Sequence, residues 1–460
     1  EVVAPTCTEQ GYTLHTCTGC GDSYKDTYVS ALGHSYGEPS WAWSEDYTNA
    51  TATFTCTNDS EHVNTLTATV TDKVTTPATC TTDGEKDYTA TVTFNNQTYT
   101  DVKTVTVEKT GHSISDNSCV YCGQPASEGL DMVFSEGEYT VSGIGTCTDT
   151  EILIPATYNG LPVASVEANA FLDKTAITSV VLPDGITSIG ENAFNGCESL
   201  TSVTFGKNSQ LSSIGPGAFN YCYSLESITI PESVTSIGSD AFYYCYGLRS
   251  VTFGENSQLT SIGEGAFNWC ESLESITIPD SVTSIGEGAF CCCAKLTSIT
   301  IPDGVKSIGN YAFAGCSALE SITIPDSVLN IGDSAFEECT ALKNITIPGS
   351  VLSIGDNAFY NCTNLVNVSL PDSLTSISFN TFYGCTNLQT YDDGTAYYLG
   401  NSENHYLVLV SVISKEITSF TIDDKTKFIW NGAFNGCRSL ERVDIPDSIL
   451  GIGHHAFQDC

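Results

Sequence analysis

Apolar residues recur at a fixed spacing over the C-terminal two thirds of this chain. Each period ends in an Ala-Phe pair, and most steps between successive phenylalanines are 23 residues long, as from Phe267 to Phe290. Two steps are 25 residues long because Gly206–Gln210 and Gly254–Gln258 lengthen one turn, and a single step of 52 residues spans Tyr391–Trp430. A period in this range predicts stacked supersecondary units rather than one globular core. The phenylalanines are Phe171, Phe194, Phe219, Phe242, Phe267, Phe290, Phe313, Phe336, Phe359, Phe434 and Phe457, with Phe382 following a threonine.

Each unit predicts two short strands and a tight return. From Cys270 the chain reads C-x-x-L-x-x-I-x-I-P-x-x-V-x-x-I-G, followed by x-x-A-F-x-x-C. Alternation of Ile276 and Ile278 indicates a strand with one buried face, which Pro279 ends because proline cannot donate to a ladder. A second extended piece ends at Ile285, and the segment that carries Phe290 is expected to form a helical or 3₁₀ turn. One unit cannot bury its own apolar face, so we expect the copies to stack.

The full repeat resembles a known family of bacterial proteins. The pattern L-x-x-I-x-I-P-x-x-V-x-x-I-G-x-x-A-F-x-x-C is similar to the bacterial surface leucine-rich repeats often called BspA-like, over roughly Thr146–Cys460. The stretch Tyr139–Phe171 looks like the opening repeat of that family. The resemblance implies cell-surface adhesion to host or bacterial partners and carries over no catalytic residue. The chain departs from the pattern at its 52-residue step, where we expect the regular stack to be interrupted.

The predicted fold is mainly β with short helical turns. Residues 128–460 are expected to form a leucine-rich-repeat solenoid of about twelve repeats, with the opening repeat near 130–171. An irregular insertion near 391–430 is expected to hold an inserted hairpin beside a degenerate repeat. Residues 1–127 are expected to form threonine- and cysteine-rich β modules in two loosely repeated units, which act as a stalk or spacer. Within them, Thr48–Thr55 and Tyr88–Tyr99 alternate like strands, with Asn95-Asn96 as a hairpin turn.

The N-terminal third contains cysteines and histidines at spacings that suit a metal. A Cys-Thr-x-x-Gly motif, a Gly-His-Ser motif and a C-x-x-C pair each occur twice, although in a different order in the two halves. Three thiolates and one imidazole suit tetrahedral zinc. The predicted sets are Cys7, Cys17, Cys20 and His34 for one structural zinc site, and Cys80, His112, Cys119 and Cys122 for the other. The same cysteines could instead form disulfides in a secreted protein, or stay reduced.

Charge and motifs exclude several functions. Lysine and arginine total 16 against 54 aspartates and glutamates, a formal charge of -38, which would repel nucleic acid and anionic membranes. The sequence has no run of 18 apolar residues that could span a bilayer, and it has no P-loop, G-x-S-x-G or H-E-x-x-H motif. We therefore predict a non-enzymatic protein. The only methionine is Met132 and Cys460 falls part-way through a repeat, so we expect a fragment of a longer protein.

Eleven repeats place a cysteine three residues after the phenylalanine, from Cys197 to Cys460. A redox or metal ladder is one interpretation, and a column of small buried apolar residues is the other and the one we favour. Cys291 and Cys292 lie beside this column at positions where other repeats hold tyrosine, asparagine, glycine or tryptophan. We expect both to be at least partly exposed.

One edge of the predicted solenoid is rich in aromatic residues. In three consecutive repeats, the positions around the ladder cysteine hold Tyr221, Tyr223, Tyr243, Tyr244, Tyr246 and Trp269. In the other repeats this edge carries mainly glycine, asparagine, glutamate or threonine. The structural alternative to a binding site is that the rings only cover the rim of the core. Exposed aromatic clusters with polar tips suit protein or sugar recognition. We predict a secreted or cell-surface adhesin for an extracellular protein or glycan, with a passive structural spacer as the alternative.

Overall fold

The computed structural model describes residues 1–80, 82–109, 112, 114–115, 117–120 and 122–460. The chain divides into two compact units, Glu1–Gly111 and His112–Cys460. Residues 112–127, which the sequence analysis grouped with the N-terminal modules, thus belong to the second unit. None of the described residues forms an apolar helix long enough to cross a bilayer.

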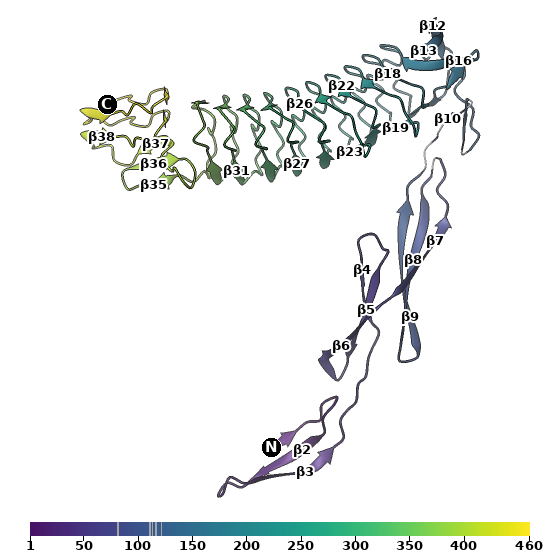
Figure 1. Cartoon of the computed structure of the whole chain (residues 1–460), viewed down its shortest axis with the longest axis vertical. Coiled ribbons are helices and arrows are strands. Elements are labelled where there is room, and N and C mark those ends of the chain that lie inside the picture. The colour runs from purple at the N-terminus through teal and green to yellow at the C-terminus, as the bar shows by residue number, and fades with distance from the viewer. Residues whose placement is uncertain (81, 110–111, 113, 116, 121) are drawn as a thin grey trace. The chain divides into compact units, whose positions relative to one another are not determined.

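The described residues of the first unit form three antiparallel sheets of three strands each (Figure 1). Its strands are β1 (Val2–Val3), β2 (Gly11–Thr16), β3 (Ser23–Val29), β4 (Ser40–Trp43), β5 (Ala50–Cys56), β6 (Asp59–Thr67), β7 (Thr69–Thr76), β8 (Gly84–Phe94) and β9 (Gln97–Val107). The predicted turn at Asn95 and Asn96 joins β8 to β9, and both residues have positive φ, 50° and 63°. This is the backbone conformation that asparagine favours in two-residue hairpins. Phe54 is fully buried and stacks on Phe94 at 4.2 Å.

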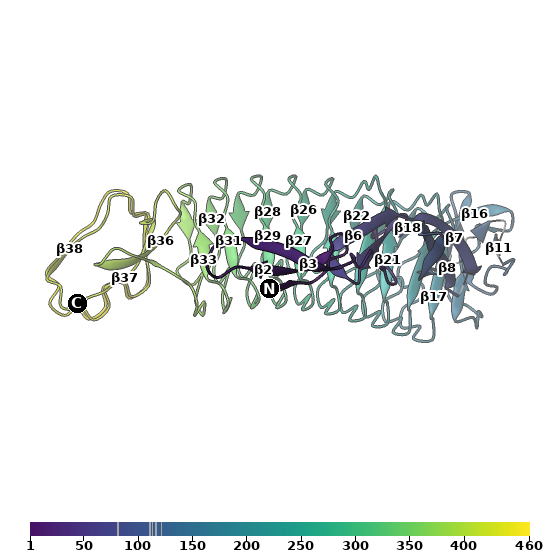
Figure 2. The same cartoon turned by 90° about the horizontal axis from the view of Figure 1, so that it is seen from below.

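The second unit is a β-solenoid with two parallel ladders of strands, which Figures 1 and 2 show following one another coil by coil. The first ladder comprises β14 (Glu151–Leu153), β17 (Ser179–Leu182), β19 (Ser202–Phe205), β21 (Ser227–Ile230), β23 (Ser250–Phe253), β25 (Ser275–Thr277), β27 (Ser298–Thr300) and β29 (Ser321–Thr323). The second comprises β16 (Leu161–Val166), β18 (Ser188–Ile189), β20 (Ser213–Ile214), β22 (Ser236–Ile237), β24 (Ser261–Ile262) and β26 (Ser284–Ile285). Each strand pairs with its copy in the next coil without a shift, so Ile276 lies opposite Ile299.

Irregular strands precede and follow this regular stretch. Before it lie β10 (Ile114–Ser115), β11 (Ser118–Cys119), β12 (Asp131–Ser135), β13 (Glu138–Gly143) and β15 (Thr157–Tyr158). The ladders continue as β28 (Ser307–Ile308), β30 (Asn330–Ile331), β32 (Ser353–Ile354) and β34 (Ser376–Ile377), and as β31 (Asn344–Thr346) and β33 (Asn367–Ser369). The last strands are β35 (Tyr391–Asp392), β36 (Ala396–Leu399), β37 (Val408–Val412), β38 (Ser419–Thr421), β39 (Phe428–Ile429), β40 (Arg442–Asp444) and β41 (Gly451–Ile452). The 52-residue step contains the antiparallel pair β36 and β37, and β39 then resumes parallel pairing.

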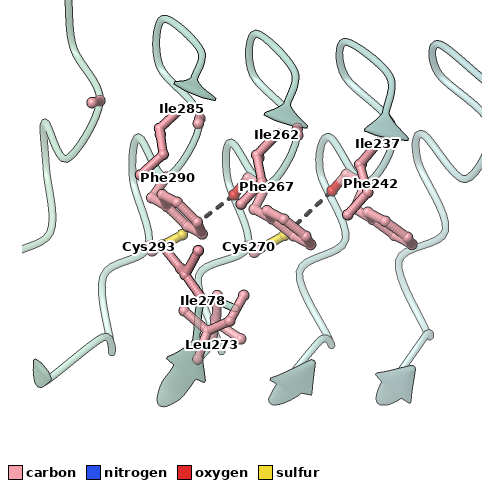
Figure 3. Packing of buried hydrophobic residues seen from close by; sticks show 14 of the residues in the cluster. Ile237, Phe242, Ile262, Phe267, Cys270, Leu273, Ile278, Ile285, Phe290 and Cys293 are labelled. Atoms are coloured by element: carbon pink, nitrogen blue, oxygen red, sulfur yellow. Dashed lines mark hydrogen bonds between the residues drawn. The ribbon is translucent and has the colours of Figure 1, made fainter. Parts of the chain in front are cut away.

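The core of the solenoid between the two ladders is a column of phenylalanines that runs from Phe171 to Phe382 (Figure 3). The 52-residue step interrupts it, as expected, and Phe434 belongs to a second core cluster. Phe267, Phe290 and Phe313 are fully buried, and their rings stack at 5.5 and 5.6 Å with nearly parallel planes. Isoleucines from both ladders and one leucine per coil surround the rings, as Leu273, Ile278 and Ile285 do in one coil. The predicted fold class, a mainly β leucine-rich-repeat solenoid preceded by β modules, is confirmed.

The segment after each Ala-Phe pair differs from the prediction, because it forms a series of turns and no helix in the described chain. Bonds of the i to i+3 kind do form, such as Cys197 N to Phe194 O at 3.2 Å. Positive φ at Asn192 and Gly196, however, interrupts the right-handed run that a helix needs. The N–H groups of alternate residues turn toward the next coil instead, as Phe194 N does toward Ala218 O at 2.8 Å. These bonds add a third connection between coils.

Nine of the eleven ladder cysteines are buried free thiols inside the core, whereas Cys385 is half-buried and Cys460 is exposed. Figure 3 shows the thiols of Cys270 and Cys293 donating to the carbonyl oxygens of Phe242 and Phe267 in the preceding coil, each at 3.3 Å. Burial raises the pKa of the Cys316 thiol to about 12. The thiolate is thus disfavoured, which supports the interpretation of this ladder as small core residues.

We expect native protein treated with iodoacetamide at pH 8 to leave the buried ladder cysteines unmodified, because a neutral buried thiol is a poor nucleophile. The exposed pair Cys17 and Cys20 should react within minutes, since the side chain of Cys20 helps to lower the pKa of the Cys17 thiol to about 7. Peptide mass spectrometry measures the modified sites, and urea-unfolded protein, in which every thiol reacts, is the control. Rapid native labelling of Cys245 or Cys270 would contradict the burial.

Candidate functional site

The six aromatic residues predicted to form one edge do come together. We call the group Tyr221, Tyr223, Tyr243, Tyr244, Tyr246 and Trp269 the aromatic edge. All six lie in the turns that follow the core residues Phe219, Phe242 and Phe267. Because the phenylalanine column fixes the start of each turn, the same turn position recurs one coil further along.

The rings of the aromatic edge form a connected cluster. Tyr221 stacks on Tyr244 at 5.3 Å, and Tyr244 lies 5.6 Å from Trp269 in the next coil. A parallel pair, Tyr223 and Tyr246, stacks at 5.6 Å. Tyr243 lies 4.2 Å from Tyr244 and 6.0 Å from Tyr221. The result is a surface of stacked rings that crosses three coils.

Three of these rings stand on an unfavourable backbone conformation. Tyr221, Tyr244 and Trp269 have φ of 57°, 58° and 59°, in the left-handed region that bulky residues avoid at a cost of about 1 kcal/mol or more each. Each lies two residues after a core phenylalanine. Most other repeats place a residue suited to positive φ at the same position, such as Gly196, Gly315, Asn361, Gly384 and Gly436, although Cys292 and Glu338 also have positive φ there. Aromatic residues here reduce the stability of the fold, which favours a functional reason for their presence.

The aromatic edge is accessible, and the hydroxyl groups of Tyr223 and Tyr246 stay protonated. Tyr221, Tyr223 and Tyr246 expose more than a third of their surface. Desolvation and the nearby Glu198 raise the pKa of Tyr223 above its ordinary value, and desolvation, Tyr244 and Glu271 do the same for Tyr246. Both phenols are therefore neutral hydrogen-bond donors at physiological pH. Flat apolar faces with donors at their rim suit a sugar ring or a protein surface.

The structure separates the members of the first predicted zinc set. Cys7 and His34 come together, and their third neighbour is Cys56, which the sequence analysis did not include. Cys17 and Cys20 lie instead in the exposed turn between β2 and β3, where the Cys20 amide donates to Cys17 Sγ at 3.4 Å. These two cysteines are not part of the cluster around Cys7.

Cys56 combines burial with groups that favour its ionised form. Burial disfavours the thiolate, but backbone groups of Ser35 and Asn58 and the side chains of His34 and Cys7 outweigh it and lower the pKa of this thiol to about 6. Cys56 belongs to a C-x-x-D-x-x-H pattern that ends at His62. This spacing was the signal in the sequence that could have identified Cys56, which C-x-x-C pairs do not include.

The residues of the second predicted zinc set lie in both units. Cys80 belongs to the first unit, whereas His112, Cys119 and Cys122 belong to the second. The ligand atoms of these last three lie within 4.8 Å of one another, with His112 Nδ1 3.4 Å from Cys122 Sγ. A structural zinc at this second set remains a proposal.

Comparison with known proteins agrees with the repeat. The sequence model described as the BspA type leucine rich repeat region matches in six copies, over residues 164–293, 260–389 and 413–460, which together are more than half of the chain. The chain belongs to the BspA-type leucine-rich repeat family. No curated protein matches it significantly.

Solved structures of other leucine-rich repeat proteins resemble this chain. A leucine-rich repeat protein from Bacteroides ovatus is 28% identical, with a TM-score of 0.51, over 72% of this chain and 91% of that one. A leucine rich cell surface protein from Faecalibacterium prausnitzii is also 28% identical, with a TM-score of 0.30, over 57% of this chain and 93% of that one. The first of these supports the solenoid fold seen here.

The BspA-type repeat pattern distinguishes the positions that build each coil from the positions that vary between coils. The core phenylalanines, the ladder cysteines and the strand isoleucines follow the repeat pattern. The rings of the aromatic edge do not, since they occupy positions that vary from coil to coil. The aromatic edge is thus a property of this chain rather than a requirement of its fold.

Two cavities on the solenoid were not predicted from the sequence. One, of about 580 Å³, is lined by residues that include Thr252, Asn256, Thr277 and Asp280, and the other, of about 570 Å³, by residues that include Thr204, Asn208, Thr229 and Glu232. Each lies beside one of the lengthened turns, 206–210 and 254–258. The two 25-residue steps of the sequence were the available signal, because a BspA-type repeat with extra residues must bulge out of the regular stack.

Proposed function

We propose that this protein is a secreted or cell-surface adhesin that binds an extracellular protein or glycan through the aromatic edge. The observation that carries the proposal is the position of Tyr221, Tyr244 and Trp269 at positive φ in three consecutive coils. Bulky rings at strained positions reduce stability, and a gain in binding accounts for them. The exposed stacked faces and the neutral phenol donors supply the contacts.

A binding role fits the chemistry of the edge better than catalysis. Its side chains are phenols and one indole, and the pKa of Tyr223 and Tyr246 is shifted away from neutrality. General acid–base catalysis requires the opposite, a pKa near the working pH. The formal charge of -38 disfavours nucleic acid and other polyanions and favours neutral or basic partners. The Faecalibacterium prausnitzii protein, described as a cell surface protein, supports a surface location.

Binding is tested with a variant that leaves the backbone relaxed. The chain with Tyr221→Gly, Tyr244→Gly and Trp269→Gly carries at these positions the residue that other repeats already use. Against extracellular-matrix proteins, mucins and a glycan array, we expect the unmodified chain to give a hit and the variant to lose about tenfold or more in affinity. Surface plasmon resonance on the hit measures the loss.

The matched control is Tyr383→Ala, which removes an exposed tyrosine from a distant coil. It should bind as the unmodified chain does. A hit that survives the triple change contradicts the site, and a change at Asn256 beside the larger cavity then tests that surface. Absence of any hit favours the alternative, a passive spacer that presents another domain.

A further inference from the structure

Five side chains with metal-binding chemistry gather at the turn between β5 and β6 in the first unit. The ligand atoms of Cys7, His34 and Cys56 lie within 4.8 Å of one another, and so do those of Cys7, Asp59 and His62. We call these five residues the thiol–imidazole cluster. It differs from the set predicted from the sequence, since Cys56 and His62 take part and the C-x-x-C pair does not.

The turn between β5 and β6 supplies three members of the cluster. Cys56 pairs with Asp59 across a two-residue turn, and His62 follows on β6. The chain thus brings a thiol, a carboxylate and an imidazole together within seven residues. The hairpin alone therefore places all three at one end of the β5–β6 pair.

Hydrogen bonds bring the other two members to the same point. The Gly33 amide donates to Cys7 O at 3.0 Å, which joins the turn that carries Cys7 to the segment that carries His34. That segment is held in turn against the β5–β6 turn by Thr57 N to Ser35 O at 2.7 Å and by Asn58 Nδ2 to Gly33 O at 3.0 Å. Three segments far apart in the sequence are therefore fastened around the cluster.

The spacing of the sulfur atoms suits a shared metal ion. Cys7 Sγ and Cys56 Sγ lie 3.5 Å apart, and both residues are almost fully buried. Two thiolates bound to tetrahedral zinc at about 2.3 Å would lie about 3.8 Å apart. A disulfide between them would leave the two imidazoles without a role.

The imidazoles are placed to complete the coordination. The rings of His34 and His62 meet edge to face at 5.1 Å. His62 Nδ1 is buried and has no hydrogen-bond partner among the residues that the structure describes. Asp59 Oδ2 lies 3.6 Å from this nitrogen, so Nδ1 faces the carboxylate and the other ring nitrogen, Nε2, is left for the metal, as in metal-bound histidines.

We propose that the thiol–imidazole cluster binds one zinc ion in tetrahedral coordination. Three ligands are Cys7, His34 and Cys56, whose ligand atoms already lie within 4.8 Å of one another. The fourth is His62, whose ligand atom lies within 4.8 Å of that of Cys7, and Asp59 positions the imidazole of His62. On binding, the two thiols release their protons, and the two thiolates balance the charge of Zn²⁺. The ion fastens the segments that carry these ligands, so a module with a small core gains rigidity from the metal.

Titration of the reduced, chelator-treated chain with Co²⁺ tests the site, because the absorption of Co²⁺ reports tetrahedral thiolate coordination. We expect saturable binding that Zn²⁺ displaces. Elemental analysis after zinc loading should show that Cys7→Ser with Cys56→Ser loses one equivalent per chain, while Cys17→Ser with Cys20→Ser loses none. Metal held elsewhere in the chain is common to both variants and cancels in this difference.

Two further measurements keep the proposal open to refutation if the double variant fails to fold. His62→Ala should lose the same equivalent, and Asp59→Asn should weaken zinc affinity about tenfold or more. Loss of zinc from the Cys17 and Cys20 variant would overturn the ligand set in favour of the C-x-x-C pair. A Cys7–Cys56 disulfide in chain purified without reductant but with zinc present, seen by peptide mass spectrometry, would replace the metal by a covalent bond.

Discussion

Replacement of Phe290 by alanine will lower the free energy of unfolding of the solenoid by about 4 kcal/mol. The ring is fully buried and stacks between Phe267 at 5.5 Å and Phe313 at 5.6 Å. Its removal opens a cavity in the middle of the column, and both neighbouring coils lose a contact face. Since each coil is stabilised mainly by its neighbours, the loss interrupts the stack on both sides.

Urea unfolding followed by tryptophan fluorescence measures this loss, because Trp269 lies in the preceding turn and reports on the same region. The control is Leu329→Ala, which shortens an exposed side chain of a later coil and should change the free energy of unfolding by less than about 0.5 kcal/mol. A loss below about 1 kcal/mol for Phe290→Ala would show that the column does not hold the coils together.

Replacement of Gly263 by alanine will destabilise the solenoid by about 3 kcal/mol, although it adds a single methyl group. A Cβ at this position would lie 2.6 Å from Gly238 C and from Ser239 N of the preceding coil. Both are backbone atoms, so no side chain can move aside. The coils would have to separate, and the ladder bond from Gly263 N to Ile237 O at 2.9 Å would lengthen.

Gly349→Ala is the matched control for this change, because nothing lies within 4 Å of a Cβ at Gly349. We expect its free energy of unfolding to stay within about 0.5 kcal/mol of the unmodified chain, or to rise slightly as the unfolded state loses freedom. Thermal unfolding of the two variants side by side measures the contrast. Equal destabilisation by both would mean that glycine is needed for its backbone freedom and not for the spacing of the coils.

The solenoid could be predicted from the sequence because its information is local and repeated. The alternation of Ile276 and Ile278 and the position of Phe290 recur in copy after copy, so one correct interpretation extends to the whole stack. The turns after the phenylalanines were predicted less well. Their spacing resembles a helical turn, but positive φ at positions such as Gly196 and Gly315 prevents a helix, and only the fold shows it.

Of the two candidate sites, one could be predicted from the sequence and the other could not. The aromatic edge was predictable because the repeat fixes where each residue lies, so Tyr221 and Tyr244 had to be neighbours. The cluster around Cys7 was not, because Cys56 lies 49 residues away and the contact depends on how separate modules meet. The C-x-x-C motif predicted a site at Cys17 and Cys20. The long-range contact between Cys7 and Cys56 instead determines which cysteines share a site.

The unshifted register between coils makes this chain extendable in whole units. Ser275, Ser298 and Ser321 face one another in successive strands, and the phenylalanine rings between them are evenly spaced. Excision of Ala294–Cys316 would join Cys293 to Ser317 and preserve the C-x-x-L spacing up to Leu319. Unequal recombination between copies in a gene could therefore change the reach of the protein by whole coils. An organism would gain or lose length without redesigning any interface.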